Sequence, residues 1–316
     1  MKTPEHIAFL VSNKLGDSLL LLPLAHNLMA HGYEVTVFGR HAYALSAWLP
    51  GLRVQPIPND GVAALSNFDR IFQMDLDQPL TLDPDQSELT VDSLTVWLRK
   101  QPPKPLLFLE ELRQFAQHVY GINSWSNDCH LYTERPDRLR HNSKRIVIHP
   151  TAGTPERYWS AEKFVRLAQR LCQKGYEVSF VVEKSDAESW VAASQGQPFD
   201  LRYFDSLLAL GNFIHESAYV IGNDSGIGHL ASALGVPTIT ICNRPRNLIR
   251  WRPQWAPGVI VPHLWLPLRT WRRKYWRFAV TVGAVERSLR KIQRIPARTT
   301  TNGPSIEPAV PAAVGD

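Results

Sequence analysis

The most informative stretch of the chain is Val220-Ile-Gly-Asn-Asp-Ser-Gly-Ile-Gly-His-Leu-Ala-Ser-Ala-Leu-Gly-Val-Pro-Thr-Ile-Thr-Ile241. Its pattern predicts a buried strand, a glycine-rich turn, a short helix and a second buried strand. The turn at 223–228 leaves backbone N–H groups free at a helix N-terminus, which favours negative charge and can hold a diphosphate. Asp224 lies beside these groups, where its carboxylate would either cap the helix or face a sugar hydroxyl. The stretch therefore indicates a nucleotide-sugar site.

The predicted elements of the second half of the chain repeat those of the first. Strands at 6–11 and 35–38 flank a helix that ends near Ala30, and strands at 145–149 and 178–182 flank a helix at 161–173. The second strand of each half opens on the same four residues, Gly32-Tyr-Glu-Val35 and Gly175-Tyr-Glu-Val178. Strands that alternate with helices in this way predict an α/β fold with two parallel, doubly wound sheets.

We expect two Rossmann-like domains, at residues 1–140 and 141–295, with the seam in a polar segment near 136–144. Residues 296–316 hold four prolines and no aromatic residue, and we expect this tail to be disordered. In parallel sheets of this kind, ligands bind beyond the carboxyl ends of the strands. Three glycine-bearing loops that follow strands are therefore expected to face one cleft between the domains: 12–17, 150–155 and 222–228.

Composition and charge narrow the class of protein. The 316 residues are 44% hydrophobic and 20% charged, as in a soluble globular enzyme, and we find no transmembrane segment in the sequence. Three scattered cysteines lack the spacing of a zinc site or a disulfide framework, so we expect a reducing, cytoplasmic compartment: Cys129, Cys172 and Cys242. Thirteen Lys or Arg and one acid lie between Arg244 and Arg294, so this region carries +12 within a net charge of +6. Such a basic region predicts an anionic partner.

Three motifs resemble those of glycosyltransferase family 9, the heptosyltransferase family that builds the inner core of bacterial lipopolysaccharide. They are Asp224-Ser-Gly-Ile-Gly-His-Leu-Ala-Ser-Ala-Leu-Gly-Val-Pro237, Gly16-Asp17 followed by Pro23, and His149-Pro-Thr-Ala-Gly153 with Arg157-Tyr-Trp159. The resemblance implies a GT-B architecture, in which an N-terminal acceptor domain and a C-terminal donor domain face a central cleft. It also implies inverting transfer of a heptose, or a similar sugar, from an ADP-sugar to a lipopolysaccharide-core-type acceptor. The co-substrate is then expected to be ADP-heptose, with no metal and no other cofactor.

Asp17 is the candidate catalytic residue. An inverting transfer needs a carboxylate that takes the proton from the acceptor hydroxyl as this hydroxyl attacks the anomeric carbon. The resemblance assigns the role of general base to the Asp that follows Gly16. The alternative is an ordinary helix N-cap at a strand-to-helix turn.

The resemblance places the donor site in the second domain. Arg157 stands where the family usually has Lys, and a cation there offsets the charge that develops on the leaving diphosphate. Arg keeps this charge but presents a planar fork in place of a point charge, and a solvated arginine is the alternative. The other expected donor contacts lie in turns that ordinary packing would also explain: Thr151, Gly153, Asp224, Ser225, Gly226, Ile227, Gly228 and His229. For His229 a structural role stays open.

A basic aromatic segment at 265–278 is the other distinctive stretch. Trp and Tyr among Arg and Lys suit an anionic glycolipid or a membrane–water interface. We therefore expect contact with the acceptor, or peripheral contact with the inner membrane, from Arg269, Arg272, Arg273 and Lys274. Single-stranded nucleic acid would suit the same composition, but no RNA-binding motif accompanies the segment and we expect no nucleic-acid partner. Alternatively, the aromatic residues pack on the core and the arginines are solvated.

Four arginines depart from the family pattern. They replace the Gly/Pro-Thr-rich loop with which the family commonly holds the base and ribose: Arg244, Arg246, Arg250 and Arg252. This departure leaves open the nucleotide base and the sugar, and with them a glycosyltransferase of the same fold that uses another donor or acceptor.

Other classes fit the residues less well. A dinucleotide-dependent oxidoreductase should carry Gly-x-Gly-x-x-Gly after the first strand, whereas the loop at 12–17 has one glycine. The presence of Asp17, Arg157 and Asp224 argues against a non-catalytic glycolipid-binding protein on this scaffold. Short acidic triplets at 75–77 and 83–85 superficially resemble Asp-x-Asp metal sites, but such triplets are common by chance and we expect no metal.

Overall fold

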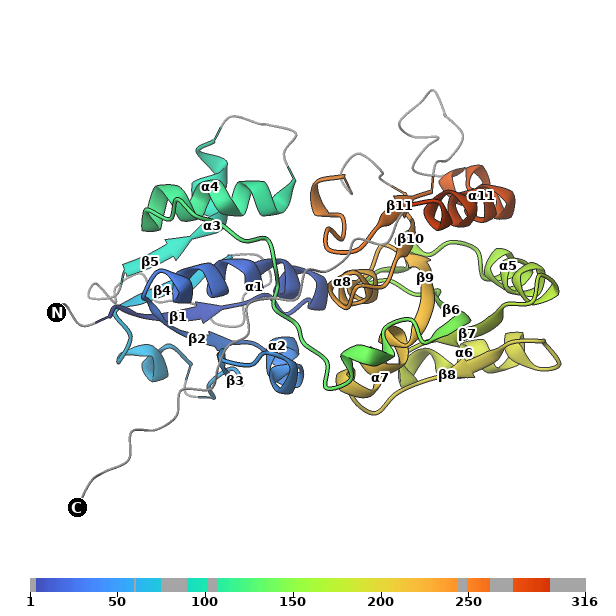
Figure 1. The fold of residues 1–316 in the computed structure, drawn as a ribbon, viewed down its shortest axis with the longest axis horizontal. Helices are drawn as coiled ribbons and strands as arrows, with labels where there is room; N and C mark the ends of the chain where they lie inside the picture. Colours follow the sequence, from blue (N-terminus) through green and yellow to red (C-terminus); the bar gives the residue numbers. More distant parts are fainter. Residues whose placement is uncertain are drawn as a thin grey trace, which may run out of the picture.

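The computed structural model describes residues 4–59, 61–74, 90–101, 107–243, 249–261 and 275–295. The described strands form two sheets, one in each half of the chain (Figure 1). The first sheet has five strands in the order β3-β2-β1-β4-β5, and the second has six in the order β11-β10-β9-β6-β7-β8. The strands pair in parallel in both sheets. The predicted α/β class with two doubly wound sheets is confirmed.

The first half of the chain builds the first sheet and its helices. Its elements are β1 (His6–Leu10), α1 (Leu15–Ala30), β2 (Glu34–Phe38), α2 (Arg40–Ala44), η1 (Ser46–Trp48), β3 (Arg53–Gln55), η2 (Gly61–Leu65), β4 (Arg70–Gln73), β5 (Thr90–Ser93), α3 (Leu94–Arg99) and α4 (Phe108–Tyr120). The predicted first strand and the helix ending near Ala30 correspond to β1 and α1.

The second half builds the second sheet in the same manner. Its elements are η3 (Pro136–Arg138), β6 (Asn142–His149), η4 (Pro155–Arg157), α5 (Ala161–Gln173), β7 (Glu177–Val181), α6 (Lys184–Ser194), β8 (Asp200–Arg202), α7 (Leu207–His215), β9 (Ser217–Asn223), α8 (Gly226–Ala233), β10 (Thr238–Ile241), β11 (Gly258–Ile260), a short helix at 275–279 and α11 (Val282–Gln293). The most informative stretch of the sequence is β9, α8 and β10, as predicted.

Side chains alternate along the central strands, so both faces of each sheet are buried. In β1, Ile7 and Phe9 belong to one apolar cluster, whereas Ala8 and Leu10 belong to another on the opposite face. Burial on both faces explains why the central strands are nearly continuous apolar runs in the sequence.

One apolar cluster extends from the first sheet into the second. It includes Phe9 of β1, Trp48 of η1, and Val220 and Leu230 of β9 and α8. The ring of Trp48 is 1% exposed and packs against Gly211 of α7, where an added Cβ would lie 2.5 Å from the ring. The two halves therefore share a hydrophobic core in addition to the clusters on their outer faces.

A second contact joins α4 to the segment at 249–261. Arg250 Nε donates to Glu111 Oε2 at 2.8 Å, and the ring of Phe108 stacks on Trp251 with centroids 4.4 Å apart. Burial raises the pKa of the Glu111 carboxyl, and the adjacent Arg250 opposes that rise. This ion pair and the stacked rings connect the two halves at a point distant in sequence from the linker.

The linker between the sheets is bound to the second half. Arg138 pairs with Glu216 at 3.3 Å, and the N–H of Arg140 donates to the carbonyl of His215 at 2.7 Å. The expected domain boundary at 140/141 falls between η3 and β6, and β6 begins at Asn142 within the expected seam. In the part of the chain that the structure describes, no helix has both the length and the apolar character that crossing a bilayer requires.

Candidate active site

The N-terminal ends of α1 and α8 meet at the boundary between the two halves (Figure 1). Glycine permits the contact on both sides. A Cβ on Gly16 would lie 2.8 Å from Cδ2 of His229, and a Cβ on Gly226 would lie 2.8 Å from Cβ of Leu15. Helix N-termini carry partial positive charge and free N–H groups, so two of them brought together favour an anionic ligand.

Asp17 lies in the first turn of α1, directly after the glycine that contacts α8, and its side chain is half-buried. Lys14 occupies the N-cap position of α1, so the N-cap interpretation of Asp17 is wrong. A local hydrogen bond holds the turn before the helix: Ser18 Oγ donates to the carbonyl of Ser12 at 2.6 Å. The helix start that carries the candidate base is therefore held both by its own loop and by α8.

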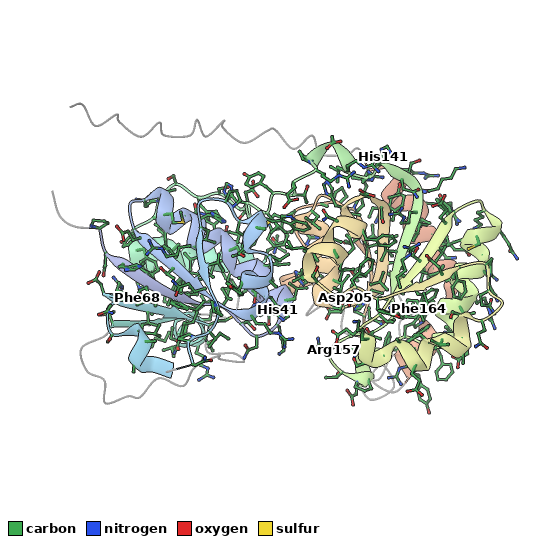
Figure 2. The ribbon with its side chains drawn as sticks, turned by 90° about the horizontal axis from the view of Figure 1, so that it is seen from below. His41, Phe68, His141, Arg157, Phe164 and Asp205 are labelled. Carbon is green, nitrogen blue, oxygen red and sulfur yellow. The ribbon has the colours of Figure 1, made fainter. Side chains whose placement is uncertain are left out.

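Residues of both halves border this region. The ring Nε2 of His41, on α2, lies 3.0 Å from the carbonyl oxygen of Asn13 in the loop before α1. Burial lowers the pKa of His41, whereas Glu183 of the second half acts to raise it. Figure 2 shows His41 and Arg157 on either side of the boundary between the halves. The start of α1 contacts Gly226, two residues after Asp224, which pairs with Arg157.

The first turn of α8 carries no capping side chain. Ser225 is the N-cap residue, yet its side chain makes no cap hydrogen bond, whereas Ser160 and Ser206 cap α5 and α7 with their hydroxyls. Ser225 Oγ is buried and has no hydrogen-bond partner among the described residues. The N-cap side chain of α8 therefore leaves the first N–H groups of this helix to other acceptors.

His229 packs at the start of α8 with 6% of its surface exposed. Burial lowers its pKa to about 4, so the imidazole is neutral near pH 7. Its Nδ1 has no hydrogen-bond partner within the described part of the chain. The ring lies against Gly16 of the other half, so the geometry supports the packing role that the sequence left open for this histidine.

Asp224 and Arg157 face each other from two loops of the second half. Nη1 of Arg157 lies 3.8 Å from Oδ2 of Asp224, and the side chains are 52% and 31% exposed. Burial raises the pKa of the Asp224 carboxyl, and the guanidinium of Arg157 opposes that rise. Because 3.8 Å is too long for a hydrogen bond, this ion pair does not use the hydrogen-bond donors of the Arg157 guanidinium.

Asn223 is a site residue that the sequence analysis missed. It ends β9 and is 3% exposed. Its Oδ1 accepts a hydrogen bond from the N–H of Trp159 at 3.0 Å, and its Nδ2 donates to the carbonyl of Pro150. One amide thereby ties both ends of the 150–159 loop to the start of the α8 turn. The position at the end of a buried strand, directly before Asp224, was the available signal.

The loop at 150–155 begins where β6 and β9 come close together. A Cβ on Gly222 would lie 2.6 Å from the carbonyl oxygen of His149. Thr151 is buried, with its hydroxyl 3.4 Å from Nε2 of His149, while Gly153 is exposed. A small cavity of about 10 Å³, roughly the space of one water molecule, lies at these strand ends, lined by His149, Val220, Gly222, Asn223, Ser225, Gly228, Thr238, Ile239 and Thr240.

A comparison with models of protein families identifies the family of this chain. The model of glycosyltransferase family 9 (heptosyltransferase) matches residues 93–260, which is more than half of the chain. The chain belongs to glycosyltransferase family 9. The matched residues include the 150–157 loop and the α8 turn, while Asp17 precedes them.

One curated relative of this family 9 chain is distant in sequence. The chain is 27% identical over 144 residues to lipopolysaccharide heptosyltransferase 3 of Escherichia coli K12. The match spans 43% of the chain and 41% of that relative, so the chain spans about two fifths of the curated relative's length.

Solved structures share the whole architecture. The chain is similar to a family 9 glycosyltransferase from Veillonella parvula, with a TM-score of 0.68 at 15% identity, over 92% of this chain and 98% of that one. It is also similar to E. coli ADP-heptose lipopolysaccharide heptosyltransferase II, with a TM-score of 0.65 at 16% identity, over 91% and 98%. For E. coli heptosyltransferase WaaC with ADP the TM-score is 0.64 at 14% identity, over 91% and 100%. The expected GT-B architecture is confirmed, and the family identifies a glycosyltransferase.

Several predicted residues of this glycosyltransferase lie outside the described residues. They are the contact residues Arg269, Arg272, Arg273 and Lys274, the acidic triplets at 75–77 and 83–85, the arginines at 244 and 246, and the tail at 296–316. Among the described residues, no group of three or more His, Cys, Asp or Glu side chains is placed to hold a metal ion. Arg250, one of the four arginines that depart from the family pattern, pairs with Glu111 of the first half.

Proposed function

We propose that this family 9 glycosyltransferase transfers a heptose, with inversion, from ADP-heptose to an acceptor of the lipopolysaccharide-core type. Asp17 is the general base, and Thr151, Gly153, Arg157 and residues 224–229 hold the donor. One observation carries the proposal: the turn with Asp17 and the uncapped turn of α8 are in direct contact through Gly16 and Gly226. A base from one half and a diphosphate cradle from the other thus lie at one boundary.

Protons and charge balance in the proposed step. The acceptor hydroxyl attacks the anomeric carbon, and the C–O bond to the diphosphate breaks. The carboxylate of Asp17 takes the hydroxyl proton, while the departing ADP gains negative charge. Arg157 and the first N–H groups of α8 stabilise that charge, because a cation and a helix N-terminus both favour an anion.

The acceptor side of the proposal rests on charge and on the family. The region between Arg244 and Arg294 carries +12, which suits a phosphorylated glycolipid. We propose that this region contacts the acceptor or the cytoplasmic face of the inner membrane, and that the chain divides into an acceptor domain at 1–140 and a donor domain at 141–295. Lipopolysaccharide heptosyltransferase 3 and heptosyltransferase II are named for such acceptors.

The decisive experiment offers radiolabelled ADP-, UDP- and GDP-sugars, ADP-heptose among them, with lipopolysaccharide-core acceptors that lack outer heptoses. We expect transfer from ADP-heptose. In Asp17→Asn the turnover should fall at least about 100-fold while donor binding stays intact, because only proton removal is lost. Transfer at the wild-type rate by Asp17→Asn would refute the base, and transfer from a UDP- or GDP-sugar alone would refute the donor.

A further inference from the structure

The turn that carries Arg157 is held by a side chain from far along the sequence. Arg277, in the short helix at 275–279, donates from Nε to the carbonyl of Tyr158 at 2.7 Å and from Nη2 to the carbonyl of Pro155. These two carbonyls flank Arg157 in η4. The planar guanidinium therefore binds a carbonyl oxygen on each side of Arg157.

Other backbone groups of this turn also have hydrogen-bond partners. The N–H of Arg157 donates to the carbonyl of Thr154 at 3.0 Å, and Asn243 Nδ2 lies 3.4 Å from the carbonyl oxygen of Glu156. The backbone of η4 is thus fixed by bonds within the turn and by two side chains, whereas the Arg157 side chain is 52% exposed. A fixed backbone beneath an exposed guanidinium limits where that guanidinium can reach.

Arg277 is itself anchored to the second half. Lys163 of α5 donates from Nζ to the carbonyls of Arg277 at 2.6 Å and of Val280 at 2.9 Å. The indole Nε1 of Trp159 donates to the same carbonyl of Val280 at 3.1 Å. The short helix, the η4 turn and the start of α5 therefore form one hydrogen-bonded unit.

We propose that Arg277 is a positioning residue, which holds the η4 turn so that Arg157 meets the diphosphate of the donor. Arg277 acts through Arg157 and does not itself touch the donor. This inference rests on the proposed donor site, and its test is designed to separate the two.

The fork of Arg277 is required by the geometry. Its Nε and Nη2 reach two carbonyl oxygens at once in a pre-organised plane, whereas a lysine ammonium is a point donor on a flexible stem. Arg277→Lys keeps the charge and tests the geometry, and Arg277→Gln removes both. Arg290→Gln, on the exposed face of α11, removes one charge from the same region and is the matched control.

Hydrogen exchange tests the clamp without any donor. In Arg277→Gln, the amides of Arg157 and Tyr158 should exchange at least about 10-fold faster than in the wild-type protein and in Arg290→Gln. The reason is that the Tyr158 carbonyl loses its side-chain donor and the Pro155 carbonyl keeps only the N–H of Tyr158. Arg277→Lys should fall between them, and it supplies the measurement if Arg277→Gln does not accumulate as folded protein. Equal exchange in Arg277→Lys, Arg290→Gln and the wild type would overturn the inference.

Donor affinity tests the route through Arg157. We expect the Kd of ADP, by calorimetry, to rise about fivefold to tenfold in Arg277→Gln, which matches the loss of about one hydrogen bond. In an Arg157→Gln background, Arg277→Gln should cause no further rise in the Kd of ADP, because the residue through which Arg277 acts is gone. Full additivity would show that Arg277 acts independently of Arg157, and wild-type affinity in Arg277→Lys would show that charge alone matters; either result would overturn the inference.

Inorganic pyrophosphate separates this inference from the proposed function. If the wild-type protein binds pyrophosphate but not ADP, the proposed nucleotide is wrong, and the same cycle run with pyrophosphate still decides the role of Arg277. If the protein binds neither, both the donor site and the role of Arg277 in it are refuted.

Discussion

The imidazole of His229 lies so close to Gly16 that a Cβ on the glycine would come within 2.8 Å of its Cδ2. The two residues belong to different halves of the chain, and the ring is buried, so it has little room to move away. Gly16→Ala should therefore lower the free energy of unfolding by about 1–3 kcal/mol, measured by urea denaturation. Adding His229→Ala should cost less in this background than in the wild type, because the clash is already relieved. Equal costs in both backgrounds would contradict the contact.

His229 should also make the fold sensitive to acid. Its pKa is lowered to about 4 in the folded protein, whereas an unfolded histidine titrates near 6.5. The unfolded state therefore binds more protons between these values, so stability falls as the pH drops from 6.5 toward 4. We expect His229→Gln to lose about 2 kcal/mol less stability than the wild type between pH 7 and pH 5.

Other buried histidines, such as His149, shift in the same direction and destabilise both proteins in acid. The measurement is accordingly the difference in slope between the variant and the wild type, from urea midpoints at several pH values. Parallel slopes would contradict a lowered pKa of His229 in the folded protein.

Asp224 should strengthen donor binding but lower the free energy of unfolding. Its pKa is raised by burial, so above about pH 4 the folded state holds the proton more tightly than the unfolded state does. The free energy of unfolding therefore falls as the pH rises above about 4. Asp224→Asn should be at least as stable as the wild type at pH 7, yet should bind the donor more weakly.

Thermal melting with and without ADP checks both parts for Asp224→Asn. The gap in stability between the variant and the wild type should shrink as the pH falls toward 4. A variant that is clearly less stable at pH 7 would mean that the long Arg157 ion pair outweighs the burial of the carboxylate.

Two glycines of the second half, Gly222 and Gly153, should differ sharply in their tolerance of a side chain. A Cβ on Gly222 would lie 2.6 Å from the backbone oxygen of His149, which cannot rotate away, whereas a Cβ on Gly153 has no atom within 4 Å. Gly222→Ala should cost about 1–3 kcal/mol of stability, and Gly153→Ala should stay within about 0.5 kcal/mol of the wild type. Chemical denaturation of the pair provides the comparison, and equal stabilities would contradict the close approach of β6 and β9.

Much of the fold followed from local patterns in the sequence. The helix predicted at 161–173 is α5, and the repeated Gly-Tyr-Glu-Val marks the start of β2 and of β7. These predictions succeed because strand burial, helix periodicity and glycine turns are encoded by neighbouring residues. The glycine-rich turn of α8 was found for the same reason.

The tertiary partners could not be predicted in this way. That Asn223 ties down the 150–159 loop, that Arg277 clamps η4, and that Arg250 pairs with Glu111 all depend on residues far apart in sequence. Asp17 shows the same limit in another form: local rules allow an N-cap, and only the observed helix start at Leu15 excludes it. Its role as a base stays a prediction.

The packing of Trp48 against Gly211 bears on how such enzymes could be recombined. A chimaera of two family 9 proteins would join the N-terminal half of one to the C-terminal half of the other. In this chain the ring of one half fills a space that only a glycine of the other half leaves open. A fusion made at the linker would bring together mismatched partners unless η1 and α7 were exchanged as a matched set. The contact between Trp48 and Gly211 therefore limits where the two halves of this chain can be exchanged.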